Sequence, residues 1–443
     1  MSQGEDPAPA ASAPPMLSLR GAILLAVGAM VGAGIFALLG QAGEIAGTAV
    51  WVSFLIAGAL SAALGYTLVK FGQRYPSSGG LVVYLLHGYR SRRLVGVASW
   101  MGYLTAVVVV CAMVAISFGD YAAAVFFDSP PGGTVSKACA VAMILAATMM
   151  TIAGARVVDR IQSWIVLLLL GVFIVFVVGT IRGVDLSLLS PTTYPSWGQI
   201  VASVAMTFFA FLGFAVITFA AGDLADPQRQ LPRAMYGALS ITTLLYVLVA
   251  VCVFGTLSVE QVIEFGPTAI AEAARPTLGD AGFALMAVAA LLATASSVTA
   301  TLYASAGMSA GLADAGLFPQ VFGKASRLGR HGGLLISAVL STLFVTVLGL
   351  GTLAAVGSAV SLAVFWLVAI AAFNHREELR ARTLPVVAAI AIATVVLVGF
   401  IIDLARNDPR SLASAILLFA LALIGQFAME MARRGRADGT RTT

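Results

Sequence analysis

Three glycines interrupt an apolar segment near the N-terminus. The stretch AVGAMVGAGIF, residues 26–36, contains Gly28, Gly32 and Gly34. Glycine in a helix interior costs about 1 kcal/mol relative to alanine. The four-residue spacing of Gly28 and Gly32 is typical of close packing between membrane helices. The alternative is an interrupted helix whose freed amides and carbonyls bind a solute, which a membrane tolerates only where they line an enclosed cavity. From this segment alone both interpretations stay open.

A second apolar segment has the same character. Residues 203–219, SVAMTFFAFLGFAVITF, place Gly213 in mid-segment among several phenylalanines: Phe208, Phe209, Phe211 and Phe214. Taken alone, these aromatic side chains are as compatible with packing in the core or against lipid as with forming the wall of a binding site. Glycine-interrupted helices at matching positions of two inverted halves point to the binding site of a transporter.

Interrupted helices offer opposite partial charges to a solute. The N-terminal end of a half-helix exposes N–H groups that suit a carboxylate, and its C-terminal end exposes carbonyls that suit an ammonium group or a cation. Two crossed half-helices therefore suit a zwitterion without any charged side chain. The predicted substrate-binding residues are Gly28, Ala29, Met30, Gly32, Ala33, Gly34, Ile35, Phe208, Phe209, Phe211 and Gly213.

Composition indicates an integral membrane protein. Of 443 residues, 60% are hydrophobic and only 10% charged, and the mean hydropathy is +0.99, whereas soluble domains carry about 25% charged residues. Runs of about 20 apolar residues are typical of spanning helices. We expect twelve spans, at 20–40, 46–70, 93–125, 138–155, 160–182, 198–222, 233–257, 281–308, 335–351, 354–373, 382–403 and 411–431.

Charge asymmetry predicts the orientation. With the N-terminus inside, 20 of the 25 Lys and Arg residues fall in loops on that side, as the positive-inside rule requires. Both termini are therefore predicted in the cytoplasm, in a multi-pass protein of the plasma (inner) membrane. The net charge of +5 reflects this topology, so no nucleic-acid partner is expected. Residues 1–19 and 432–443 are predicted cytoplasmic tails, the first of them disordered.

Three stretches resemble one transporter superfamily. GAMVGAGIF resembles the first-helix signature of the amino acid–polyamine–organocation superfamily, and FFAFLGF with GDLADPQRQLPRA resembles its sixth helix and the following loop. ASSVTATLYASAGMSAGLADAGLFP, 295–319, is similar to its eighth helix. The resemblance implies an all-α fold of the LeuT type, a 5+5 inverted repeat of helices over 20–182 and 198–373 with two peripheral helices over 382–431. It also implies an amino acid or a related amine as cargo.

The charges of the spans favour a neutral cargo. No Asp, Glu, Lys or Arg lies near the middle of any predicted span, and an intramembrane charge would mark a functional site. Asp120 and Glu44 lie at the predicted outer ends of spans, where they suit either an external vestibule or solvated helix ends. A polyamine would require a carboxylate in the cavity. We therefore expect a small or apolar amino acid, with an amine permease or an amino acid exchanger as the alternatives.

The coupling ion is not decided by the sequence. Relatives that couple to protons or exchange substrates commonly carry a lysine in helix five, and Leu169 occupies the matching position here. Sodium-coupled members of the fold use two carbonyls of helix one with one carbonyl and two hydroxyls of helix eight. The corresponding residues here are Gly28, Val31, Ala293, Ser296 and Ser297. However, serines in membrane helices often bond to their own backbone, so Na⁺, H⁺ and exchange all stay open.

Other classes of protein fit poorly. An enzyme would cluster His, Asp, Glu or Cys at the bilayer face, and the three histidines are scattered over predicted loops at 87, 331 and 375. A channel would line a pore with polar or charged residues, and a sensor would carry a soluble signalling domain. The three cysteines have no metal-ligand spacing. We expect no enzyme activity and no cofactor beyond a coupling ion.

Overall fold

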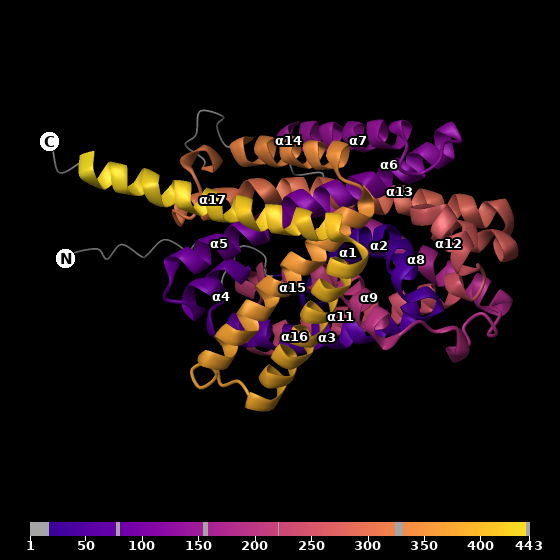
Figure 1. Cartoon of the computed structure of the whole chain (residues 1–443), viewed down its shortest axis with the longest axis horizontal. Helices are drawn as coiled ribbons and strands as arrows, with labels where there is room; N and C mark the ends of the chain where they lie inside the picture. Colours follow the sequence, from indigo (N-terminus) through magenta and orange to yellow (C-terminus); the bar gives the residue numbers. More distant parts are fainter. Residues whose placement is uncertain (1–16, 77–79, 154–157, 220, 324–330, 440–443) are drawn as a thin grey trace, which may run out of the picture.

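A computed structural model describes residues 17–76, 80–153, 158–219, 221–323 and 331–439 (Figure 1). Of the predicted N-terminal tail, residues 1–16 lie outside the described residues. The helices that carry the fold are, in chain order, α1 (Leu19–Ala33), α2 (Ile35–Ala46), α3 (Val50–Arg74), α4 (Gly80–Gly88), α5 (Arg92–Tyr103), α6 (Val110–Phe127), α7 (Thr134–Ala153), α8 (Val158–Thr180), α9 (Trp197–Ala210), α10 (Val216–Phe219), α11 (Pro227–Phe254), α12 (Val259–Phe265), α13 (Ala269–Asp314), α14 (Gly332–Val347), α15 (Leu350–Asn374), α16 (Thr383–Asn407) and α17 (Pro409–Gly439).

The all-helical class is confirmed. Within the described ranges, nine helices are long and apolar enough to cross a membrane, or ten when the bent pair Trp197–Ala210 and Leu212–Phe219 counts as one span. Two further apolar helices, Leu19–Gly32 and Gly332–Val347, are shorter. The 16 residues of α14 rise about 24 Å, less than the ~30 Å hydrocarbon core. Twelve spans and the inverted repeat therefore remain predictions.

Several helices run roughly along the longest axis of the molecule. Figure 1 shows α7, α13, α14 and α17 in this direction, with α4 toward the left end and α12 toward the right end. These two short helices belong to loops for which the charge pattern predicts opposite sides of the membrane. The side of the membrane on which each helix lies stays a prediction of the charge pattern.

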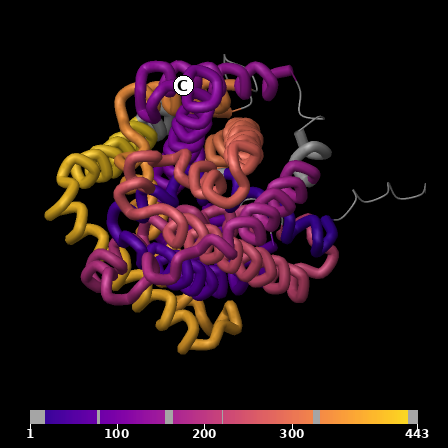
Figure 2. Tube along the Cα trace, turned by 90° about the vertical axis from the view of Figure 1, so that its right-hand side faces the viewer, coloured from indigo at the N-terminus to yellow at the C-terminus, as the bar shows by residue number. Residues whose placement is uncertain are grey.

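The last two helices lie at the margin of the bundle. Viewed along the long axis, the orange-to-yellow end of the chain follows the left and lower edge of the molecule (Figure 2). Only 17% of the apolar window of α17 is buried, the lowest share among the candidate spans of the described chain. A low buried share suits a helix that faces lipid, and α17 continues to Gly439, beyond the predicted end of its span.

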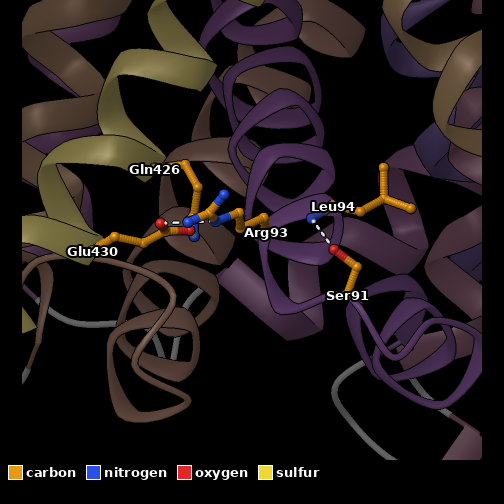
Figure 3. Close-up of polar contacts among 5 residues, drawn as sticks. All are labelled: Ser91, Arg93, Leu94, Gln426 and Glu430. Carbon is orange, nitrogen blue, oxygen red and sulfur yellow. Dashed lines mark hydrogen bonds and ion pairs between the residues drawn. The ribbon is translucent and has the colours of Figure 1, made fainter.

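Serine side chains fix the starts of several helices. The Ser18 hydroxyl accepts the Gly21 N–H at 3.1 Å at the start of α1, and the Ser91 hydroxyl accepts the Leu94 N–H at 3.4 Å at the start of α5 (Figure 3). Such caps satisfy amides that have no partner within the helix and contribute about 1 kcal/mol each.

Polar side chains attach α17 to α5. Figure 3 shows Arg93 of α5 directed at Glu430 of α17, with an N–O distance of 3.0 Å. Gln426 Nε2 donates to the same carboxylate at 3.4 Å. A methyl group on Gly96 would lie 2.0 Å from Gln426 Oε1, so glycine allows this close approach of the two helices.

Candidate functional site

The first predicted interruption is a break between α1 and α2 at Gly34. This residue has φ −91° and ψ −70°, and its N–H donates to the Met30 carbonyl at 2.9 Å. Its own carbonyl accepts the Leu38 N–H at 3.1 Å. Gly28 and Gly32 lie inside α1, so of the three glycines only Gly34 marks the end of a helix.

The second interruption bends its span by 46° between α9 and the 212–219 segment. A 3₁₀ turn, η6 (Leu212–Ala215), precedes α10. The Phe211 N–H donates to the Phe208 carbonyl and the Phe214 N–H to the Phe211 carbonyl, both at 2.9 Å. The carbonyls of Phe208 and Phe211, two of the predicted substrate-binding residues, therefore already accept local hydrogen bonds.

The two interruptions lie in direct backbone contact. A methyl group built on Gly213 would lie 2.4 Å from the Met30 amide nitrogen and 2.9 Å from the Ala29 Cβ. One built on Gly34 would lie 2.6 Å from the Ala210 carbonyl oxygen. Only glycine permits backbones to approach this closely. The structure thus brings together two segments that are about 180 residues apart in sequence.

Tyr246 of α11 joins the two breaks. Its hydroxyl donates to the Ala210 carbonyl at 3.3 Å, which satisfies a backbone group at the C-terminal end of α9. The same hydroxyl would lie 2.6 Å from a methyl group on Gly34. The motifs and spacings of the sequence did not predict a role for this residue. A tyrosine inside the apolar run TTLLYVLVAV was the available signal, because a buried Tyr hydroxyl usually has a hydrogen-bond partner.

The predicted phenylalanines pack into aromatic clusters. Phe208 and Phe211 are fully buried. Phe208 lies edge-on to Phe365 of α15, with ring centroids 5.9 Å apart, and Phe211 lies 5.1 Å from the Tyr246 ring. The ring of Phe209 lies against Gly357 of α15. In this conformation the rings fill the space between helices, as the core interpretation of the phenylalanines predicts.

The helix-one and helix-eight residues of the predicted ion site meet at Gly32. A methyl group on Gly32 would lie 3.3 Å from the Ala293 carbonyl oxygen and 3.4 Å from Ser297 Cβ. Val31 is buried, and the carbonyl of Gly28 points along α1 toward Gly32, as in any α-helix. Gly32, which follows Val31 and lies one turn after Gly28, is therefore the residue of α1 that lies beside this part of α13.

The hydroxyls of α13 differ in their hydrogen bonds. Thr294 donates to the Ala290 carbonyl at 2.6 Å and Thr299 to the Ala295 carbonyl at 2.8 Å. Among the described residues, the half-buried Ser296 and Ser297 side chains make no hydrogen bond. The two threonine hydroxyls are thus used in hydrogen bonds to the backbone of their own helix, whereas the two serine hydroxyls are free to accept or donate.

The face of α1 that carries Gly28 packs against α8. A methyl group on Gly28 would lie 2.3 Å from Val166 Cγ2, and Leu169, one turn further, is buried. The position at which relatives carry a lysine therefore lies in the apolar contact between α1 and α8. No amine of α8 is available there.

The start of the first interrupted span is also joined to the end of the second. The Leu17 N–H, just before α1, donates to the Asp223 carbonyl at 2.8 Å, and Leu17 forms a β-bridge with Leu224. Most of the predicted substrate-binding residues are buried, with Met30, Ile35, Phe208 and Phe211 fully so. Ala29 and Gly213 are half-buried.

Comparisons with known proteins match nearly the whole chain. A sequence model of the amino acid permease family matches residues 17–425, which include both interruptions. The inner membrane transport protein YbaT of Escherichia coli is 30% identical over 414 residues, 94% of this chain and 96% of the relative. An uncharacterized protein of Methanocaldococcus jannaschii is 29% identical over 83% of this chain and 84% of its own length. The methylthioribose transporter of Bacillus subtilis is 26% identical over 80% of each chain.

Proposed function

Because the chain belongs to the amino acid permease family, we propose that it is a secondary active transporter of a small or apolar amino acid. It moves this cargo across the membrane by alternating access, coupled to Na⁺ or H⁺. The contact between the breaks at Gly34 and Gly213 carries the proposal. Two interrupted helices that touch through glycines provide a site that opens when they separate and closes when they meet.

The backbone at this crossing suits a zwitterion. The N-terminal end of α2, from Ile35 onward, presents amides and a partial positive charge to a carboxylate, whereas the Gly34 N–H is already donated to Met30. The carbonyls of Ala29, Met30 and Ala210 face the ammonium group. Since Met30 and Ala210 already accept one hydrogen bond each, the ammonium group uses a second lone pair or displaces the Tyr246 hydroxyl.

The cargo is neutral overall, because the crossing has no charged side chain. The surrounding rings of Phe208, Phe209 and Phe211 restrict it to a small or apolar side chain. A neutral sugar thioether is a second candidate cargo, because one relative is named a methylthioribose transporter. An amine lacks the carboxylate that the amides of α2 suit, so an amine permease is the weaker alternative, as is an exchanger without ion coupling.

Sodium is the coupling ion that the polar groups favour. The free hydroxyls of Ser296 and Ser297 lie on the α13 turn that contacts Gly32. With the carbonyls of Gly28, Val31 and Ala293 they provide five oxygens without a formal charge. Coupling through a lysine of α8 is disfavoured by the apolar contact at Val166 and Leu169. A proton carried by another group is the alternative.

The test is uptake of labelled solutes into proteoliposomes. A panel of amino acids, together with methylthioribose and a primary amine, is offered under an imposed Na⁺ gradient and separately under a pH gradient. We expect Na⁺-dependent uptake of a small or apolar amino acid. Ser296→Ala and Ser297→Ala should each raise the Na⁺ concentration for half-maximal uptake by about tenfold or more, since each removes one of five ligands. Thr299→Ala is the matched control, because its hydroxyl bonds within α13.

The outcomes separate the parts of the proposal. Uptake that is indifferent to Na⁺, or an equal effect of Thr299→Ala, rejects the sodium site and leaves H⁺ coupling or exchange. Uptake of methylthioribose in preference to every amino acid rejects the cargo. Absence of uptake under both gradients and with internal counter-substrate rejects transport of these solutes altogether.

A further inference from the structure

A pocket of about 290 Å³ lies away from the helix crossing, at the end of the molecule that the charge asymmetry predicts as outer. It is formed by the ends of several helices and their loops, and its lining includes Gln41, Asp120, Ser136, Lys137, Pro267 and Leu350. Its volume is near the lower end of the range for small-molecule sites, about 300–1,000 Å³. A ligand of a few heavy atoms fits it.

Asp120 brings a carboxylate to the wall of this pocket from α6. The residue is only 2% exposed. Its Oδ1 atom accepts the Gly132 N–H at 2.7 Å and the Ser136 hydroxyl, and these bonds hold the loop before α7. Within the described residues Oδ2 has no hydrogen-bond partner. An accessible carboxylate oxygen without a partner, on an otherwise buried residue, is a strong acceptor for a cationic group.

Lys137 brings the opposite charge to the same pocket from α7. Its ammonium group donates to the Thr346 carbonyl at 3.2 Å, which uses one of its three hydrogens. No ion pair of the described chain includes either Asp120 or Lys137. One pocket thus holds a carboxylate and an ammonium group that do not pair with each other. Glu44, the other acid predicted near this end, is exposed and does not line the pocket.

We propose that this pocket is a second binding site for zwitterionic α-amino acids, in which Asp120 receives the ammonium group and Lys137 the carboxylate. The site rests on the proposed function, since it collects the cargo before the two interrupted helices separate. It recognises the two charges of the backbone of an amino acid and leaves the side chain toward the apolar wall of Pro267 and Leu350. Each of the two charges gives the cargo one charge-assisted contact.

Kinetics of L-alanine uptake into proteoliposomes test the charges one at a time. Asp120→Asn keeps an oxygen that accepts from Gly132 and Ser136 and removes the charge, so the loop stays in place. Lys137→Gln removes the other charge. We expect each variant to raise KM by about three- to tenfold with the maximal rate within twofold, because each loses one charge-assisted contact. Glu44→Gln is the matched control, because it removes an exposed acid that does not line the pocket, and Lys137→Arg should keep the wild-type KM.

Two half-ligands distinguish the roles of the two residues. n-Propylammonium should inhibit the wild-type protein and Lys137→Gln alike and Asp120→Asn much less. Propionate should inhibit wild-type protein and Asp120→Asn alike and Lys137→Gln much less. This crossed pattern is not expected from a general disturbance of the fold. An unchanged KM in both charge variants, or inhibition that ignores the variants, overturns the proposal.

The proposed transport function and the proposed second binding site can be rejected independently. Normal Na⁺- or H⁺-driven uptake with no effect of either charge variant keeps the proposed function and rejects the pocket. If the wild-type protein takes up no amino acid, calorimetric titration of the purified full chain with n-propylammonium and propionate tests whether the pocket binds the two charged groups. Binding that depends on Asp120 and Lys137 respectively upholds the paired site without the transport assignment. Loss of pH-driven uptake in Asp120→Asn with intact exchange identifies a proton carrier and overturns the docking role.

Discussion

Single glycines control how closely the central helices approach. Gly34 and Gly213 have no room for a methyl group, since the nearest atoms would lie 2.6 Å and 2.4 Å from it, and those atoms belong to backbone groups. The cost of these residues to helix stability is therefore offset by contacts that no other residue allows. Gly171 of α8 provides the contrast, because nothing lies within 4 Å of a methyl group there.

This contrast yields a prediction. Gly34→Ala pushes α1 and α2 away from Ala210 and Tyr246, so we expect it to reduce the uptake rate by tenfold or more and the stability by about 1–3 kcal/mol. Gly171→Ala removes a helix-interior glycine without a clash and should raise stability by up to about 1 kcal/mol with normal uptake. Uptake rates are compared at equal amounts of protein in the liposomes, and stability by thermal unfolding. Equal behaviour of the two variants would contradict the close-approach role of Gly34.

At the scale of elements, side chains tie helix ends together outside the membrane spans. The Tyr75 hydroxyl, just after α3, donates to the Glu378 carboxylate in the turn between α15 and α16. The His87 ring of α4 stacks on Tyr75 with centroids 4.0 Å apart, and His375 lies 3.5 Å from the same carboxylate. Three separate helix ends thus meet at one exposed carboxylate.

This contact predicts a pH dependence. The hydrogen bond from Tyr75, with a smaller contribution from His375, holds the pKa of the Glu378 carboxyl below its ordinary value of 4.5. A lowered folded-state pKa stabilises the fold above the unfolded value, and this stability disappears as pH falls through the folded pKa. Thermal unfolding of the wild-type protein should therefore lose stability below pH 4.5, and Tyr75→Phe should lose less over the same window.

A matched variant checks the assignment. Glu377→Gln changes the neighbouring exposed acid, which does not contact Tyr75, and should keep the wild-type pH profile. The pKa of the Tyr75 hydroxyl is raised by the same bond, so its contribution is present below pH 10 and disappears above its raised folded pKa. An acid profile of Tyr75→Phe identical to that of the wild-type protein would show that the bond does not form in solution.

At the scale of the whole molecule, local sequence patterns predicted the helices better than they predicted the contacts between helices. Apolar runs located the helices, and glycines located both interruptions, because these properties belong to neighbouring residues. The family predicted from GAMVGAGIF and FFAFLGF is confirmed. The contact of Gly213 with Met30 and the hydrogen bond from Tyr246 to Ala210 were not predictable from such patterns. They depend on how far each helix is shifted and rotated against another, which no local periodicity specifies.

The sides of the membrane provide the last prediction. In a background without Cys111, Cys139 and Cys252, Glu260→Cys in α12 and Glu377→Cys after α15 place thiols at two exposed positions. The positive-inside rule puts Glu377 beside Arg376 and Arg380 in the cytoplasm and Glu260 outside. A membrane-impermeant maleimide should therefore label Cys at 260 in intact cells and Cys at 377 only after permeabilisation. Labelling of both from outside would require an even number of spans between them, whereas the predicted spans between α12 and the α15–α16 turn are three, over 281–308, 335–351 and 354–373. Three spans place the two positions on opposite sides, so labelling of both in intact cells would reject this part of the topology. Labelling of only the cysteine at 377 in intact cells would show that the entire chain has the opposite orientation. The Asp120 pocket would then lie on the cytoplasmic face.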